Sequence, residues 1–589
     1  MSRILGAVCA GTVSSLILCG LLVQDLQASK LAERTAAADE LVQEALHREI
    51  YGLQRDRDRL LQEALQIKPD YAPAKWHQGY VRFRNEWVSA DVVPQWAGRN
   101  LRRIAYERLR EGQADTVAGN LAMANWCREK DLLDQERAHL SRVVDLEPNH
   151  RSARARLGFR PANGRWVEDA AIRATEERQQ AERRAMAKWR PDLEEWRDDL
   201  LQRSEKKRMA AAAAVRDIQD PAAIPAMERV LSPHSLEAAL LVVEALSQMP
   251  GQEAVESLMR HTVLSPRAEV RDEAAQQLKQ RKAECFVPGL LAELYTPVIS
   301  RTEVAATGRG QIGYRHVFER EGQDQRRVMI LDTAYERMAL PGGDGRDSLK
   351  RILVDTANRA ATRERAVARE NLETQLRNER ITQALNTATN QQRSASPELW
   401  WQWWNQENDV VVQGEKQTRT IQEGTQLTVV DTGAMQQQAE CFAAGTIVWT
   451  STGTLAIEAV RVGDLVLSQD VDSGELSFKP VLRTTLRPQE PLFKVQIGED
   501  PFHTTAGHLF WVSGHGWVRA RELKSGMQVH TVGGGEMVVE IEKDAPSAET
   551  HNLVVADFHT YFVGKSRVLS HDVTNRRPTA SVVPGLSEH

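Results

Sequence analysis

The stretch CFAAGT at residues 441–446 begins the change in sequence pattern that decides the fold of the C-terminal part. The helical spacing of apolar residues that dominates the preceding chain ends here. Short runs of β-branched and aromatic residues follow, separated by Gly and Asp turns, which is a pattern typical of strands. Examples lie at 446–449, 463–468, 492–497, 510–512 and 537–541. The pattern predicts an all-β domain over residues 441–572.

Histidine is concentrated in this domain, which holds seven of the chain's 15 histidines in less than a quarter of its length. They are His503, His508, His515, His530, His551, His559 and His571. Because histidine titrates near neutral pH, the enrichment favours a chemical role for the segment. The histidines show no recognisable zinc-ligand spacing. We expect His503, His515 and His530 to be ordinary surface or core residues.

Several motifs in this segment resemble, in the same order, those of the Hint domain, the self-processing module shared by hedgehog proteins and inteins. They are CFAAGT with IEAVRVGD at 457–464, TTAGHLF at 504–510, HTYFVG at 559–564 and VLSHD at 568–572. The motifs are most similar to bacterial Hint domains of the polymorphic-toxin type. The resemblance covers about 441–572 and carries no information about residues 1–440.

The resemblance implies a reaction at the peptide bond before Cys441. The thiol of Cys441 would attack the carbonyl of Glu440 and move the chain from nitrogen to sulfur as a thioester. His508 would protonate the departing nitrogen, and Thr505 would orient the peptide, because an amide nitrogen leaves poorly without a proton. The thioester would then hydrolyse or pass to an acceptor nucleophile. All these groups are internal, so no cofactor is expected.

The C-terminal end of the module departs from the intein pattern. Asp572 stands where inteins carry Asn and lacks the amide nitrogen that attacks in the final cyclisation, although the assisting histidine is present as His571. Val573, which follows, offers no nucleophile for chain transfer. Asn552 occupies a position where many inteins carry Asp, whereas His559 matches the family. Complete splicing is therefore not expected, and cleavage before Cys441 is the reaction that remains.

An uncharged apolar segment lies near the N-terminus, at residues 4–23 after Arg3. About 20 such residues can span a bilayer, and a short basic start before an apolar run is also the layout of a signal peptide. We therefore expect residues 1–28 to be a signal peptide or a membrane anchor. The rest of the chain would then be exported to the cell envelope, either periplasmic or membrane-anchored. A buried helix of a globular domain is the alternative.

Residues 33–190 are predicted to be helical and carry two similar segments, at 64–80 and 143–159. Each reads as a helix end, a Pro-led turn and a new helix that begins with small residues. This pattern is similar to tetratricopeptide repeats, in which helix–turn–helix units stack into a solenoid.

A second set of repeats lies in residues 200–300, with helix starts at 220–227, 251–258 and 284–291. These segments resemble HEAT-type repeats, whose helix pairs bury one another's apolar faces. The chain is thus expected to be multidomain, with α-solenoid repeats followed by the all-β domain. Because solenoids mostly bind proteins along a concave surface, unknown protein partners are expected here.

Residues 301–410 combine a predicted hairpin, from strands at 310–318 and 327–331, with a helix from 348 to about 392. Four tryptophans then lie within residues 400–404. Such a cluster either forms a carbohydrate or membrane-interface platform or, more often, packs as a cap on the preceding domain. The remaining segments are a predicted polar linker at 411–440 that contains one or two strands, and a tail at 573–589 that is too short to hold a packed domain.

Composition excludes several classes of protein. The net charge of −5 gives no basic excess, so nucleic acid is not an expected partner. The five cysteines form no CxxC pair and are too scattered for a disulfide framework, which argues against zinc ribbons and thioredoxin-like redox sites. Cys127 and Cys285 lie among apolar residues and are expected to be buried structural thiols.

Three functional hypotheses remain, of which the first two belong to different classes. The first is a self-processing protein that cuts before Cys441 and releases or transfers its helical part. The second is a protein-interaction scaffold of the cell envelope in which the Hint domain is inactive. Asp572, Val573 and Asn552 favour it, and the intact Cys441, Thr505 and His508 oppose it. A weaker third reading is envelope carbohydrate binding through the tryptophan cluster.

Overall fold

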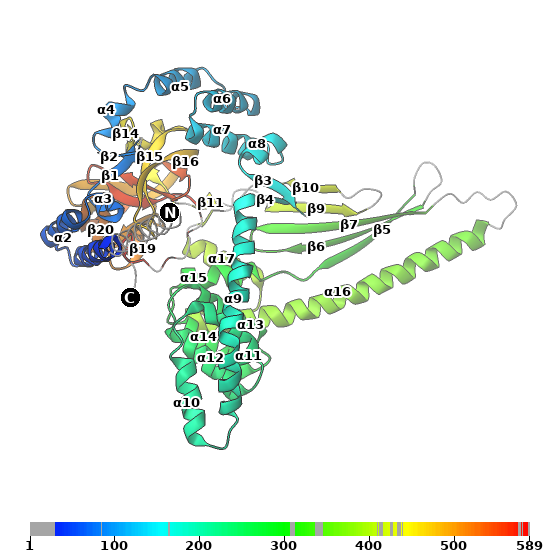
Figure 1. Ribbon diagram of the computed structural model, residues 1–589. Coiled ribbons are helices and arrows are strands. Elements are labelled where there is room, and N and C mark those ends of the chain that lie inside the picture. The colour runs from blue at the N-terminus through cyan, green and yellow to red at the C-terminus, as the bar shows by residue number, and fades with distance from the viewer. Residues whose placement is uncertain are drawn as a thin grey trace, which may run out of the picture. The chain divides into compact units, whose positions relative to one another are not determined.

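The computed structural model describes residues 30–83, 85–162, 165–306, 312–335, 345–408, 410–411, 416–423, 428–432, 437–438, 440–574, 576, 579 and 581–586 (Figure 1). The chain divides into two compact units. Unit 1 comprises residues 1–157, 439–574 and 580–589, and unit 2 comprises residues 158–438 and 575–579. The apolar segment 4–23 lies outside the described residues. None of the described helices is long and apolar enough to cross a membrane.

The C-terminal part of unit 1 is all-β, as the sequence predicts. Its two longest strands, β16 (Leu476–Ile497) and β21 (Gly534–Val555), have 22 residues each and pair antiparallel. Their register shifts at several points, and such bulges bend and twist a strand. The other strands are β12 (Phe442–Ala443), β13 (Ile447–Thr450), β14 (Gly453–Ala456), β15 (Leu465–Gln469), β17 (Asp500–Thr504), β18 (Leu509–Val512), β19 (Gly516–Arg519), β20 (Gln528–Thr531), β22 (Thr560–Val563) and β23 (Val568–His571).

The topology of this sheet brings the two ends of the module together. Strand β12, directly after Cys441, lies between β17 and β21. The last strand, β23, pairs with both β18 and β22. Apolar side chains from these strands fill a common core that includes Phe442, Phe510 and Tyr561. The sheet therefore places the first and last residues of the module around one buried centre.

The N-terminal part of unit 1 is mainly helical. A helix covers residues 30–50. It is followed by α2 (Gln54–Ile67), α3 (Ala72–His77), the hairpin β1 (Tyr80–Phe83) and β2 (Glu86–Ser89), α4 (Val93–Ala97), α5 (Leu101–Glu111), α6 (Val117–Glu129), α7 (Leu133–Leu146) and α8 (Arg151–Arg156). Helices α6 and α7 pack as a pair, and Cys127 is buried between apolar neighbours, as expected. Burial raises the pKa of the Cys127 thiol to about 12.

The two repeated segments differ from tetratricopeptide units. In each, the helix after the Pro-led turn, α3 or α8, is only six residues long and leads into a two-stranded hairpin. The reason lies in Gly79 and Gly158, which end the short helices with φ of 80° and 85°. This left-handed conformation suits glycine and stops a helix. The following alternation of polar and apolar residues then favours strands.

A buried charged cluster joins the N-terminal helices to the β-sheet within unit 1. The carboxylate of Glu49 accepts hydrogen bonds from His530 Nδ1 at 2.6 Å, from Ser513 Oγ at 2.7 Å and from Arg57 Nε at 3.0 Å. Burial would raise the pKa of Glu49, but His530 and Arg57 outweigh it and hold the pKa well below its usual range. We call Glu49, Arg57, Ser513 and His530 the Glu49 cluster. His530 is thus a buried structural residue, as predicted.

The tail also packs inside unit 1. Val583 and Leu586 are buried in the apolar core formed by the helix at residues 30–50 and α2. The backbone carbonyl of Gly585 accepts a hydrogen bond from Gln43 Nε2 at 3.2 Å. The sequence prediction of a tail at 573–589 therefore misses its anchoring, because a few apolar residues suffice when an existing core accepts them.

The first part of unit 2 is built from packed helices. The hairpin of β3 (Phe159–Ala162) and β4 (Arg165–Glu168) opens it. The helices are α9 (Asp169–Leu200), α10 (Glu205–Arg216), α11 (Ile224–Val230), α12 (Leu236–Gln248), α13 (Gln252–Leu264), α14 (Ala268–Leu278) and α15 (Ala283–Ala292). Helices α12 to α14 pack against one another as the HEAT-like spacing predicts. Their apolar faces form one core, against which Cys285 is half-buried.

The second part of unit 2 is a five-stranded sheet beside a long helix. The predicted hairpin is present as β6 (Ile312–Glu321) and β7 (Gln325–Tyr335), flanked by β5 (Ile299–Ala306). Strands β9 (Gln417–Glu423) and β10 (Thr428–Thr432), from the linker segment in which one or two strands are expected, complete the sheet, with β9 parallel to β7. Helix α16 (Gly345–Thr389) matches the predicted helix.

The tryptophan cluster is structural. Helix α17 (Pro397–Glu407) presents Trp400, Trp401, Trp403 and Trp404 to the core of the HEAT-like helices, and all four are buried. Buried indole rings cannot stack on a sugar or enter a membrane interface. The prediction that this cluster packs on the preceding domain is confirmed, and the prediction that it forms a carbohydrate-binding platform is wrong.

Candidate functional site

The backbone at Cys441 is held by two threonines at the end of β17. The amide N–H of Cys441 donates to Thr505 Oγ1 at 3.0 Å, and the Thr505 N–H donates to the Cys441 carbonyl at 3.0 Å. Thr504 Oγ1 donates to the same carbonyl at 2.9 Å. The predicted orienting role of Thr505 therefore has a geometric basis, and Thr504, which the sequence analysis missed, shares it. These three hydrogen bonds fix Cys441, which lies on the nitrogen side of the peptide bond between Glu440 and Cys441.

The carbonyl side of the same bond faces an amide donor. Asn552 Nδ2 donates to the backbone carbonyl of Glu440. The side-chain oxygen of Asn552 accepts from Tyr561 Oη at 2.7 Å and from the Leu553 N–H at 2.7 Å, which fixes the amide nitrogen toward Glu440. A donor on the carbonyl oxygen of Glu440 polarises that carbonyl and favours negative charge on its oxygen. From the sequence, Asn552 is interpreted only as the loss of a carboxylate, and the capacity of its amide to donate is the signal for this further role.

His508 is buried beside this junction. Its Nε2 lies 2.7 Å from Ser570 Oγ, and its ring packs on Phe442 with centroids 3.9 Å apart. Burial is the main cause that lowers the pKa of His508 to about 3, and His571 lowers it further, while a backbone hydrogen bond with Glu440 opposes the shift. His508 is therefore a neutral imidazole at neutral pH. Ser570, which the sequence analysis missed, can fix its tautomer.

Cys441 is also uncharged at rest. Burial raises the pKa of its thiol to about 11, although the charge of Arg487 and the hydroxyl of Thr550 act in the opposite direction. Because the thiolate is the nucleophile, the thiol proton must be removed as the sulfur attacks. Cys441 and His508 are both neutral at rest, and the site therefore holds no standing thiolate–imidazolium pair.

The C-terminal junction is built from the other predicted residues. His571 Nδ1 lies 2.6 Å from the carbonyl oxygen of Asp572. The Asp572 carboxylate accepts from the Val555 N–H at 2.9 Å, from His559 Nδ1 at 3.1 Å and from the Thr574 N–H at 2.8 Å. Burial would raise the pKa of Asp572, but His559, His571 and Thr574 outweigh it and lower the pKa. Asp572 is thus a fixed anion that orients His559.

The structure brings the six predicted site residues to the two junctions of one module. Cys441, Thr505 and His508 surround the N-terminal junction, and His559, His571 and Asp572 form the C-terminal one. The adjacent Ser570 and His571 connect them, since Ser570 contacts His508. Among the described residues, no group of three or more His, Cys, Asp or Glu side chains is placed to hold a metal ion.

Two family models match parts of the chain. The family model described as the pretoxin HINT domain matches residues 447–574, and that of the PBS lyase HEAT-like repeat matches residues 207–232. A comparison with curated proteins gives no match. Among solved structures, the chain is similar to a bacterial intein-like domain from Clostridium thermocellum, with 36% identity over 22% of this chain and 97% of that one, at a TM-score of 0.21.

Two inteins are further structural neighbours. A DnaB intein from Synechocystis is 16% identical over 23% of this chain and 98% of its own, at a TM-score of 0.21. The gp41-1 intein is 22% identical over 22% of this chain and 98% of its own, at a TM-score of 0.20. The matched part of the present chain is the C-terminal all-β module, and helical repeats precede it.

Proposed function

Because the C-terminal part of the chain is a Hint domain, we propose that it cleaves its own peptide bond between Glu440 and Cys441. The observation that carries this proposal is the environment of that bond: Asn552 donates to the Glu440 carbonyl, and Thr505 accepts from the Cys441 nitrogen. A neutral thiol and a neutral imidazole, from Cys441 and His508, complete the set. These groups supply a nucleophile, a proton carrier and a polarised carbonyl.

The first step is an N-to-S acyl shift. The sulfur of Cys441 bonds to the carbonyl carbon of Glu440, and the bond from that carbon to the Cys441 nitrogen breaks. His508 carries the thiol proton to that nitrogen, which leaves as an amine. In the second step, water or another nucleophile bonds to the same carbon and the carbon–sulfur bond breaks. With water, Glu440 gains a free carboxyl group and the Cys441 thiol is restored.

Hydroxylamine tests for the thioester, because it attacks thioesters much faster than amides. We expect the treated full chain to give an N-terminal fragment that ends in a hydroxamate at Glu440, seen by mass spectrometry of its C-terminal peptide. The Cys441→Ala variant should give no such peptide, whereas Cys127→Ala, which removes another buried thiol, should behave as the parent. Hydroxamate formation in Cys441→Ala, or its absence from the parent, would contradict the thioester route.

We further propose that cleavage does not separate the fragments. Residues 30–157 and the C-terminal module belong to the same compact unit and share the buried Glu49 cluster. Charges in such a cluster lose their partners when the two parts separate, which is costly in a dry environment. After cleavage, the fragments should migrate apart under denaturing conditions and elute together, near 66.1 kDa, on native gel filtration. Separate native elution would contradict this.

The location and partners of the protein are proposals that rest on sequence. The apolar run at residues 4–23 supports export to the cell envelope, as a periplasmic or anchored protein. The HEAT-like helices support binding of protein partners. Cell fractionation with an antibody to unit 2 tests the location, and recovery in the cytosolic fraction would overturn it.

The second candidate function is a scaffold with an inactive Hint domain. The observation that favours it is the fixed Asp572 carboxylate, whose oxygens accept from Val555, His559 and Thr574 and which has no amide nitrogen for cyclisation. This arrangement affects the C-terminal junction and leaves the geometry at Cys441 intact. A chain that gives neither fragments nor hydroxamate would make the scaffold the better account.

A further inference from the structure

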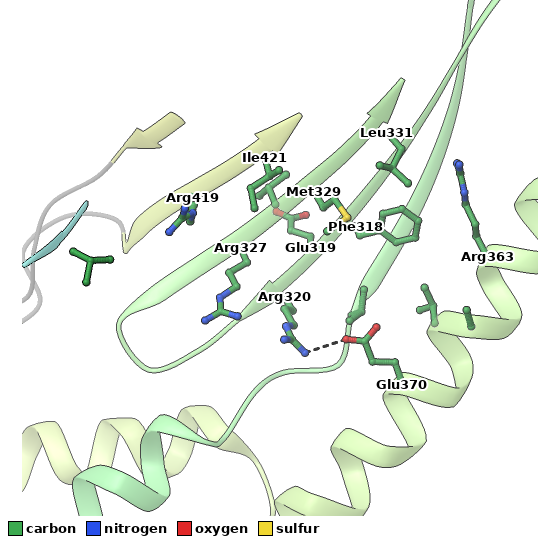
Figure 2. Close-up of a pocket in the computed structure, with 15 residues that line it drawn as sticks. Phe318, Glu319, Arg320, Arg327, Met329, Leu331, Arg363, Glu370, Arg419 and Ile421 are labelled. Carbon is green, nitrogen blue, oxygen red and sulfur yellow. Dashed lines mark hydrogen bonds and ion pairs between the residues drawn. The ribbon is translucent and has the colours of Figure 1, made fainter. Parts of the chain in front are cut away.

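Unit 2 contains a cavity that the self-processing chemistry does not use. It has a volume of about 740 Å³ and lies between helix α16 and the face of the sheet formed by β6, β7 and β9 (Figure 2). Arg320, Arg327, Arg363 and Arg419 line it together with Glu370, and Glu319 also borders it but pairs with Arg326 on the other face of the sheet. The volume is in the range of small-molecule sites. The excess of arginine gives the walls a net positive charge.

Three of these arginines form a row across the sheet. Arg320 on β6 is the direct register partner of Arg327 on β7, which in turn is the partner of Arg419 on β9. Cross-strand partners point to the same face of a sheet, with their side chains close together. Like charges placed directly opposite one another destabilise a sheet. The row therefore carries a folding cost, which an anionic ligand would offset.

Protein groups hold the row in place and neutralise part of it. Arg320 pairs with Glu370 on α16 at 3.1 Å, which Figure 2 shows as a dashed line. The guanidinium groups of Arg320 and Arg327 lie over the ring of Tyr295, at 4.6 Å and 5.4 Å from its centroid. Stacking on an aromatic ring fixes the guanidinium plane while leaving its N–H groups able to donate. Such a group can take a carboxylate or phosphate.

An apolar row lies directly beside the arginine row. Phe318, Met329 and Ile421 are register partners on the same three strands, two residues along each. Val367 of α16 lines the cavity opposite them. Met329 keeps 44% of its surface exposed, although it sits in the centre of the sheet. The cavity therefore joins an apolar floor to a cationic end.

We propose that this cavity binds a single-chain amphiphile with an anionic head group, such as a long-chain carboxylate. The head group contacts the row of Arg320, Arg327 and Arg419, and the hydrocarbon chain lies along Phe318, Met329 and Ile421. Charge-assisted hydrogen bonds to the arginines fix the orientation, and burial of the chain supplies most of the affinity. The proposal is independent of the cleavage reaction.

Calorimetric titration of the full-length Cys441→Ala chain, which cannot process itself, tests the proposal. We expect monomeric dodecanoate to bind, dodecanol to bind about 10-fold more weakly because it lacks the charge, and acetate to show no binding. Phosphatidylglycerol vesicles test whether the cavity instead takes an anionic lipid head group from a membrane. Binding to the vesicles without binding to dodecanoate would overturn the single-chain ligand, as would equal affinity for dodecanol.

Variants then locate the site. Arg327→Ala should weaken dodecanoate binding about 10-fold or more. Arg326→Ala is the matched control, because Arg326 is adjacent on β7, points to the opposite face and pairs with Glu319. Met329→Ser tests the apolar floor and serves as the second variant if Arg327→Ala does not fold. Unchanged dodecanoate binding in Arg327→Ala or Met329→Ser would overturn the proposal. Dimers that form on gel filtration whether or not dodecanoate is present would also overturn it.

Discussion

Asn552 places an amide donor at the carbonyl oxygen of Glu440, where the proposed attack by Cys441 would develop negative charge. Loss of one such donor slows acyl-transfer enzymes by roughly 100-fold or more. We therefore expect Asn552→Ala to slow thiol-induced cleavage by about 100-fold, measured from fragment bands over time. Asn552→Asp should also slow it, because a carboxylate cannot donate. A rate within about twofold of the parent in both variants would exclude the polarising role.

A substitution at Asp572 is predicted to add a reaction, whereas the substitutions at Asn552 are predicted to slow one. His571 is already in place on the Asp572 carbonyl, so the missing element at this junction is a side-chain amide nitrogen. Asp572→Asn should allow cyclisation and release a peptide from Val573 to His589, detected by mass spectrometry under denaturing conditions. Asp572→Ala is the control, since it removes the carboxylate without supplying a nitrogen. Release in both variants would show that cyclisation is not the cause.

At the scale of elements, the helix over residues 30–50 and α2 clamp the β-module through the Glu49 cluster. In a nicked chain, Glu49→Ala should raise the dissociation rate of the fragments by about 100-fold, because Arg57 and His530 are left buried without their carboxylate. Glu49→Gln serves if the alanine variant does not fold. Glu44→Ala, which removes an exposed ion pair with Arg48 on the same helix, is the control and should change little.

A recognition site for a specific protease is inserted before Cys441, and treatment with that protease cuts the chain there independently of self-processing. Gel filtration of the nicked chain then reports the dissociation rate directly. If Glu49→Ala and Glu49→Gln both retain the fragments as firmly as the parent, the cluster is not what holds them.

Elements with a strong local pattern could be predicted from sequence. The strands of the β-module, the hairpin of β6 and β7, helix α16 and the HEAT-like helices follow periodicity and turn residues. What could not be predicted depends on contacts between distant segments. The pairing of β9 with β7, the packing of Val583 on the N-terminal helices and the bond from Asn552 to Glu440 join residues far apart in the chain. Composition and spacing do not encode such pairings.

The candidate site shows the same division. Cys441, Thr505 and His508, which the motifs single out, lie at one junction, and their roles stay predictions from the family resemblance. The roles of Ser570 and Tyr561 depend on the neighbours that the fold gives them. A serine and a tyrosine in a strand otherwise read as ordinary core residues, so no sequence signal identified them.

At the scale of the molecule, buried neutral histidines should make the stability of unit 1 depend on pH. Burial lowers the pKa of His77 to about 3 and that of His139 to about 4. In the unfolded chain both protonate near pH 6.5, so stability is fully present above that pH and is lost as the pH falls toward 4. Each group contributes at most about 1.4 kcal/mol per pH unit in this window.

The free energy of urea-induced unfolding at pH 7 and pH 5 measures this effect. Both ring nitrogens of His77 lack hydrogen-bond partners among the described residues, so His77→Leu should be tolerated. It should reduce the difference between the two pH values. An unchanged difference in His77→Leu would show that this residue is already protonated in the folded state or titrates in its usual range.

The central claim is that the chain cuts itself before Cys441, and intact mass under denaturing conditions tests it most directly. The purified chain is incubated with and without dithiothreitol, beside Cys441→Ala. We predict thiol-accelerated fragments of about 49 and 17 kDa, scaled by length from 66.1 kDa and before any signal removal, and none from Cys441→Ala. A chain that stays at full length under both conditions, or fragments that persist in Cys441→Ala, would contradict the account.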